Sequence, residues 1–354
     1  MSLPTDNRYS VNTKVHSLPQ KNQCAVCKTQ QKITVCTGCR VIHYCGSAHQ
    51  KLGWAKHKWL CKAVRVSIGH VAELTADVKR EIEAAGGGYE AYFRSYPPVA
   101  ESLLQFKSIL ARNYVKVGTL AGTLEGLEHF LEIDRLSVSA NAREVRLQTS
   151  DFIPGLLLRL GWDQECYNFL KEKCNGNLEG IYRCDINTGI PVRPANPENF
   201  SLAHASMLCV LKLRIIEDLH NLHQADIALG NKLPAELFTE VRSYLISEAM
   251  RTQPDLMEGI DARVPLPDFM KVFSWDVRNL RHYVDALDID YWDALQYPDE
   301  YMKMQPIHDS ELPIAAALGQ TFDTWAETPG PFALFDGVCA AWGRGVGLRP
   351  CFAV

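Results

Sequence analysis

Eight potential metal ligands between residues 24 and 61 constrain the fold of this chain more than any other feature. Their order is Cys24-x2-Cys27-x8-Cys36-x2-Cys39-x5-Cys45-x3-His49-x7-His57-x3-Cys61. A C-x2-C pair brings two sulfurs to one ion through a tight turn, and an x3 spacing places two ligands on one face of a helical turn. Zinc is tetrahedral and takes thiolate and imidazole ligands, so four pairs satisfy two ions. Because a segment of about forty residues buries too little apolar surface to fold alone, we predict that two Zn²⁺ ions hold it together.

The same residues resemble the MYND-type zinc finger. The matching elements are the two C-x2-C pairs, then Tyr44-Cys45, His49-Gln50, and Trp54 with His57 and Cys61. His49 stands where many members of the family have a cysteine. The resemblance implies an interleaved cross-brace, in which Cys24, Cys27, Cys45 and His49 hold one ion and Cys36, Cys39, His57 and Cys61 hold the other. It also implies a protein-interaction module that accepts short proline-containing peptides, with Gln50 and Trp54 at the peptide-contacting positions.

The charge of the finger and the surroundings of its aromatic residues leave alternatives open. From Lys21 to Arg65 there are nine Lys or Arg and no acid, whereas the remaining residues hold 28 bases and 41 acids. With each zinc site at −1, the finger carries roughly +7, which also suits nucleic-acid binding. Trp54 either contacts a peptide or fills the small core of the finger. We expect Trp59 and Leu60 to pack at the junction between finger and helix.

The remainder of the chain has the apolar spacing of helices and little strand-type alternation. Apolar residues recur every three or four positions from Val64 to Ile82, and a run of glycines at 86–88 stops the pattern. Breaks are expected near Gly118 and Gly122 and at Gly161, and Ser201 is expected to cap a helix ending near His223. The fold class predicted is therefore mainly α: a small two-zinc cross-brace finger followed by an irregular α-helical body, bundle or solenoid-like. This layout resembles fungal MYND proteins with a long helical C-terminal region.

Composition gives the expected domains and compartment. The boundaries are a disordered leader at 1–20, the finger at 21–63, an α-helical domain at 64–330 and a glycine-containing tail at 331–354. The leader lacks the apolar region of a secretory signal, and no apolar run is long enough to span a membrane. We therefore expect an intracellular protein, nuclear or cytoplasmic, whose cysteines beyond the finger are buried thiols rather than disulfides.

Catalytic motifs are not recognised in the sequence. The motifs of a SET methyltransferase domain, which some MYND proteins carry, do not occur, and neither do G-x-S-x-G, H-E-x-x-H or G-x-x-x-x-G-K. His220 and His223 lack further ligands nearby, and the acids between Asp285 and Glu300 do not follow a calcium-binding pattern. The terminal Cys351-Phe352-Ala353-Val354 fits a prenylation motif only formally. The sequence thus predicts a non-enzymatic, zinc-dependent interaction protein with a proline-containing protein partner; a DNA-associated regulator or a divergent enzyme in the helical body are the alternatives.

Overall fold

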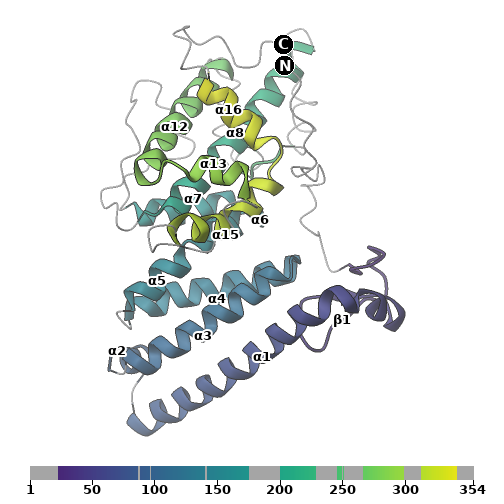
Figure 1. The fold of residues 1–354 in the computed structure, drawn as a ribbon, viewed down its shortest axis with the longest axis vertical. Helices are drawn as coiled ribbons and strands as arrows, with labels where there is room; N and C mark the ends of the chain where they lie inside the picture. Colours follow the sequence, from purple (N-terminus) through teal and green to yellow (C-terminus); the bar gives the residue numbers. More distant parts are fainter. Residues whose placement is uncertain are drawn as a thin grey trace. The chain divides into compact units, whose positions relative to one another are not determined.

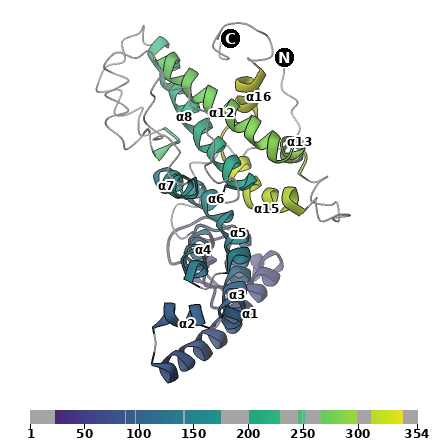
Figure 2. The ribbon, with the colours of Figure 1, turned by 90° about the vertical axis from the view of Figure 1, so that its left-hand side faces the viewer.

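The structure, a computed structural model, consists of two compact units. It describes residues 23–86, 88–95, 97–139, 142–174, 200–228, 245–248, 250, 266–298 and 312–340. The first unit, here the finger unit, is Ser17–Leu156, and the second, the C-terminal unit, includes Leu157–Val354. Both are built mainly of helices (Figures 1 and 2). The mainly α-helical fold class with a small finger is confirmed. The division between the two units, after Leu156, falls within the segment 64–330 that the sequence assigned to the α-helical domain.

The finger unit begins with two short strands and one long helix. Strands β1 (Thr34–Val35) and β2 (His43–Tyr44) are antiparallel, with Thr34 opposite Tyr44. Helix α1 (Ser47–Ala85) starts inside the finger and continues without a break for 39 residues. It ends at Gly86, which has the left-handed φ of 69° and donates its N–H to the carbonyl of Ile82. The predicted continuity of finger and helix, and the glycine stop, are both confirmed.

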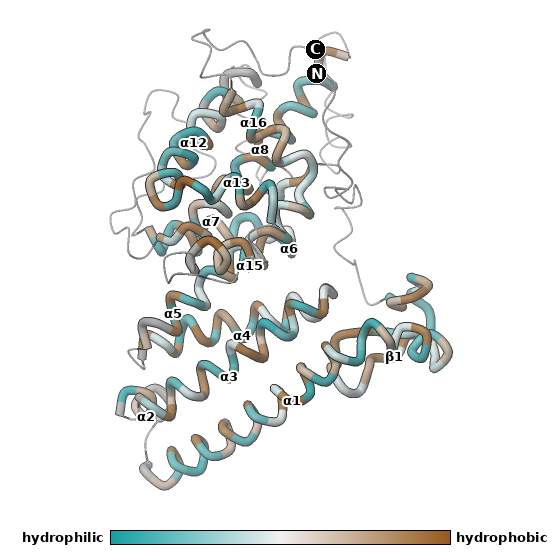
Figure 3. The backbone as a smooth tube through the Cα atoms, viewed as in Figure 1, coloured by the Kyte–Doolittle hydropathy of each residue, from teal (hydrophilic) through white to brown (hydrophobic). Residues whose placement is uncertain are grey.

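Helix α1 packs on the hairpin of α3 (Pro97–Lys116) and α4 (Leu120–Ser139), and these helices run side by side in Figure 1. Hydrophobic segments recur along the whole of α1 (Figure 3), and its apolar positions Val64 and Val78 are fully buried. The predicted break lies at Gly118, where φ is 70°. Gly122 instead lies inside α4, where a Cβ would come within 2.5 Å of the Tyr114 carbonyl oxygen. Glycine there lets the two helices approach closely. Short helices α2 (Tyr89–Ser95) and α5 (Arg143–Ser150) complete the unit.

Two hydrogen bonds fasten the finger to this hairpin. The Thr119 hydroxyl, in the turn between α3 and α4, donates to the backbone carbonyl of Val41 in the finger at 2.8 Å. Farther along α1, the Asn113 amide donates to the Ser67 hydroxyl at 3.0 Å. The finger is therefore held both by its own loop and by the helix that leaves it.

The C-terminal unit is organised around α8 (Leu202–Ala228), which lies beside α12 (Leu266–Leu287) in Figure 2. Most side chains of α8 are buried all round the helix, as expected of a central helix. The Ser201 hydroxyl accepts the backbone N–H of His204, so the predicted cap is confirmed. The unit also contains α7 (Asp163–Lys173), α13 (Tyr291–Gln296) and α15 (Leu312–Glu327). In its core, Ser206 accepts hydrogen bonds from both the Trp325 indole and the Tyr291 hydroxyl.

Two further predictions about the chain can be compared with the structure. Helix α6 (Phe152–Arg159) and α7 meet at Gly161, where φ is 75°, as predicted. The expected tail at 331–354 is instead helical at its start, since α16 (Pro331–Ala340) buries Leu334 and Phe335. The leader at 1–20 and residues 341–354, with the formal prenylation motif, lie outside the described residues. In the described part of the chain, no helix is long and apolar enough to cross a membrane.

Candidate metal centre and finger surface

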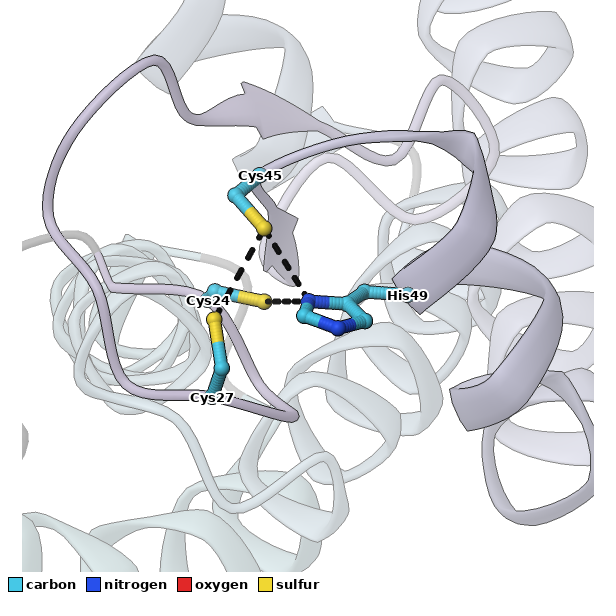
Figure 4. Close-up of side chains that lie close together, drawn as sticks. All are labelled: Cys24, Cys27, Cys45 and His49. Atoms are coloured by element: carbon cyan, nitrogen blue, oxygen red, sulfur yellow. Dashed lines mark hydrogen bonds between the residues drawn. The ribbon is translucent and has the colours of Figure 1, made fainter.

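The first predicted ligand set converges at one end of the finger (Figure 4). Cys24 and Cys27 come from the first loop, Cys45 follows β2, and His49 lies in the first turn of α1. Their ligand atoms all lie within 4.8 Å of one another. Nδ1 of His49 is 3.0 Å from Sγ of Cys45 and 3.5 Å from Sγ of Cys24, and the sulfurs of Cys27 and Cys45 are 3.7 Å apart.

The second set is buried against α1. Cys36 and Cys39 come from the loop between the strands, and His57 and Cys61 lie one turn apart on the helix. Nε2 of His57 is 3.4 Å from Sγ of Cys36 and 3.5 Å from Sγ of Cys39. The sulfurs of Cys36 and Cys61 are 3.7 Å apart.

These separations fit two tetrahedral zinc ions. With zinc–sulfur bonds of about 2.3 Å and zinc–nitrogen bonds of about 2.0–2.1 Å, tetrahedral angles require about 3.8 Å between two sulfurs and about 3.6 Å between sulfur and nitrogen. Both sulfur–sulfur distances match, and three of the four sulfur–nitrogen distances fall within about 0.2 Å. The grouping is the interleaved one that the resemblance implied. The finger therefore has two distinct zinc sites, in which zinc would hold the loops and the helix in place.

Each C-x2-C pair forms the same strained turn. The residue after its second cysteine has a left-handed backbone, with φ of 61° at Lys28 and 63° at Arg40. The N–H of each donates back at 2.9 Å, from Lys28 to the carbonyl of Cys24 and from Arg40 to that of Cys36. Left-handed φ values are unfavourable for residues with a side chain. A zinc ion bound by the two cysteines of each turn would offset this strain.

The thiols of each cluster lie so close together that a negative charge on one raises the pKa of its neighbours. Burial works against the thiolate of Cys24, but backbone N–H groups of Cys27, Cys45 and Val26 donate to it and lower its pKa to about 6. Burial and the neighbouring sulfurs raise the pKa of Cys45 to about 11 and that of Cys61 to about 12. Burial lowers the pKa of His57, which keeps its imidazole neutral, as a metal ligand must be. Zinc supplies the positive charge that several adjacent thiolates require.

Two glycines, which the sequence reasoning missed, make room for this arrangement. A Cβ on Gly38 would lie 2.5 Å from Sγ of Cys61. A Cβ on Gly53 would lie 2.9 Å from the ring of the buried Tyr44, which packs against this turn of α1. Both glycines lie between ligands in the sequence, Gly38 in the second C-x2-C pair and Gly53 between His49 and His57. That position could have indicated their role, because only a residue without a side chain fits where a ligand or a ring approaches so closely.

The residues predicted to contact a peptide lie on α1 between the ligands. Gln50 is partly exposed and one turn from Trp54, which is 46% exposed, with its ring edge-on to His57 at 5.9 Å. Trp54 therefore does not simply fill the core. The prediction that Trp59 packs at the junction is wrong, because its side chain is 69% exposed. Residues two positions apart point to opposite sides of a helix, so burying His57 and Cys61 turns Trp59 outward.

Comparisons with known proteins agree with this geometry. The sequence model of the MYND finger family matches residues 24–61, so the chain contains a MYND finger, a type of domain that generally mediates protein interactions. The chain is also similar to the Rho GTPase-activating protein gacZ of Dictyostelium discoideum, with 35% identity over 63 residues. That match covers 17% of this chain and 6% of the relative's length. No solved structure matches the chain significantly.

Other candidate ligands do not assemble into sites within the described ranges. The two zinc clusters are the groups of cysteine, histidine or acidic residues found there with metal-binding geometry, and neither His220 nor His223 belongs to them. Cys166, Cys174 and Cys209 are buried thiols, as expected, whereas Cys339 is only partly buried. Burial raises the pKa of each of these thiols. His43 is partly exposed in β2 and lies outside both clusters.

Proposed function

We propose that the protein is a non-enzymatic intracellular adaptor whose MYND finger binds a short proline-containing segment of a partner protein. The observation that carries the proposal is the exposure of Trp54 on a helix whose position the ligands on either side of it determine. A flat indole packs well on proline rings, and a glutamine amide one turn away can bond an extended peptide backbone. Both groups are oriented before the partner arrives, which reduces the entropy lost on binding.

The rigid support of Trp54 favours recognition over a structural role. His57, three residues along the helix, contacts the indole edge-on and holds its imidazole toward the second zinc site. Tyr44 packs at Gly53, immediately before Trp54. Metal binding and the orientation of the indole are therefore coupled, and loss of zinc is expected to abolish peptide binding.

An array of proline-containing decapeptides, probed with the full chain, tests the proposal. Wild type is compared with Trp54→Ala and Gln50→Ala, and with Trp59→Ala as a matched control on the same helix. We expect Trp54→Ala to weaken binding at least about tenfold, in the range of tryptophan anchors at interfaces, and Trp59→Ala to leave it unchanged. Zinc content, measured on each variant, must remain that of wild type.

The same proteins separate the DNA-associated alternative, which the acid-free basic finger favours. A 30-base-pair duplex, titrated from about 50 to 200 mM salt, reports phosphate contacts through the slope of affinity against salt. Strong, salt-dependent DNA binding that survives Trp54→Ala, together with an absence of proline-peptide binding, would overturn the adaptor proposal.

A further inference from the structure

A second apolar surface runs along the outer side of α1 and is not used by the core, the metal or the proposed peptide site. Leu52 and Trp59 are each 69% exposed, and Val66 is 46% exposed. They are spaced by seven residues, so they lie almost in line along the helix over about 21 Å. We call these three residues the outer stripe; the exposed Ala48 and Ala55 lie in the same line.

Around Trp59, the outer stripe lies on the side of α1 opposite the buried His57, Cys61 and Val64. At 100° per residue, Trp59 lies about 140° around the helix from the buried Val64, which faces the hairpin. It lies about 140° from Trp54 as well, on the other side. Two tryptophans on one helix thus point to different faces, and the second cannot take part in the peptide site proposed for the first.

Basic residues flank this stripe, and no acid interrupts it. Three exposed bases lie along one flank, each one residue before a member of the stripe: Lys51, Lys58 and Arg65. The exposed Lys62 follows Ala48 and Ala55 in the line of the stripe itself. The ammonium of Lys58 lies 5.5 Å from the centre of the Trp59 ring, so charge and indole form one surface. The first acidic residue of α1 is Glu73, beyond the stripe.

We infer that the outer stripe is a docking site for an acidic amphipathic helix of a partner protein. Apolar residues at a spacing of seven suit a second helix lying along α1, and the flanking bases occupy the positions where such pairs exchange charges. The stripe is one side chain wide, which suits the seam between two helices; a helix that lies in a membrane surface needs a broad apolar face. Nucleic acid would use the bases but has no need of the aligned apolar residues.

A display library of heptad-patterned helical peptides tests this inference on the full chain. The peptides carry varied apolar residues at the two seam positions and either acidic, neutral or basic residues at the flanking positions. We expect acidic members to be enriched and to bind wild type and Trp54→Ala equally. Trp59→Ala should weaken the enriched peptides at least about tenfold, and reversing Lys58 and Arg65 to glutamate should shift the selection toward basic members.

Each contrary outcome is measurable. Enrichment without a charge preference, or binding unchanged in Trp59→Ala at wild-type zinc content, would overturn the inference. So would association of the free protein through this face, seen as Trp59-dependent dimerisation in sedimentation. Trp59-dependent binding to phosphatidylserine vesicles or to a DNA duplex, with no peptide enriched, would assign the stripe to those ligands instead. Trp54→Ala tests the proline-peptide site and Trp59→Ala tests the outer stripe. Either proposal can therefore fail while the other is still tested.

Discussion

Replacing Gly38 by alanine tests directly whether the buried sulfur cluster is a zinc site. The added methyl would lie 2.5 Å from Sγ of Cys61, whereas carbon and sulfur in contact need roughly 3.5–4 Å. One of the two must therefore move by about 1 Å or more. Zinc–ligand distances tolerate only about 0.2 Å, so Cys61 cannot keep its bond. The backbone of Gly38 is not in the left-handed region, so the sulfur alone opposes the change.

We expect Gly38→Ala to weaken the second site by on the order of 4 kcal/mol, the scale of destabilisation that follows loss of a metal ligand. At 1.4 kcal/mol per factor of ten, its zinc affinity falls about a thousandfold. Chelator competition followed by zinc analysis should show one tightly held ion where wild type holds two. The first site, made by Cys24, Cys27, Cys45 and His49, should retain its ion.

Gly69→Ala is the matched control. Gly69 lies inside α1, and a Cβ there would meet nothing within 4 Å. Alanine should therefore stabilise the helix by about 0.5–1 kcal/mol without changing zinc content. If Gly38→Ala holds two ions as tightly as wild type and Gly69→Ala, the reasoning from the sulfur geometry is refuted.

Three further predictions concern the finger and the two cores. Removing zinc by chelation should unfold residues 23–46 while the α3–α4 hairpin stays helical, because the metal supplies the folding energy of the loops; amide NMR signals that keep their dispersion after complete chelation would contradict this. Phe130→Ala should lower the free energy of unfolding by about 3–5 kcal/mol in denaturant melts, since this side chain is fully buried. The neighbouring Leu131→Ala, 42% exposed, should cost well under half as much, and equal costs would contradict the packing. Burial raises the pKa of Asp218 from 3.8 to about 7 despite two backbone N–H donors. The folded state then keeps a proton that the unfolded chain releases between about pH 4 and 7, so stability falls as pH rises through this window by at most about 4 kcal/mol. Asp218→Asn should remove that part of the slope, and an unchanged slope would exclude Asp218 as its source.

The zinc sites could be predicted because the ligand pairs are recognised from the number of residues between them. C-x2-C and x3 pairs specify which residues can share an ion, and the resemblance to MYND fingers added which pairs combine. The long helix after Cys61 followed from an apolar period that ends in glycines. Each of these features depends on residues close together in the chain, which is why sequence reasoning reached them.

The division of the body into two units and the role of individual glycines depend on contacts between distant residues. The hydrogen bond from Thr119 to Val41 joins positions 78 residues apart, and no local pattern indicates it. Trp59 was expected to pack at the junction between finger and helix, whereas its place between two inward-facing ligands determines that it points outward. Helical phase, read from His57 and Cys61, would have corrected that prediction.

Helix α1 runs without a break from the zinc sites to the segment that packs on the α3–α4 hairpin. The orientation of the finger relative to the hairpin is therefore fixed by this helix. His49, His57 and Cys61 belong to the same helix as Val64 and Val78, so finger and packing face share one screw axis. Inserting a single residue between Cys61 and Val64 would turn the finger by about 100° and advance it by about 1.5 Å relative to the hairpin. The number of residues along α1 thus determines the orientation in which the finger would present a bound partner relative to the hairpin.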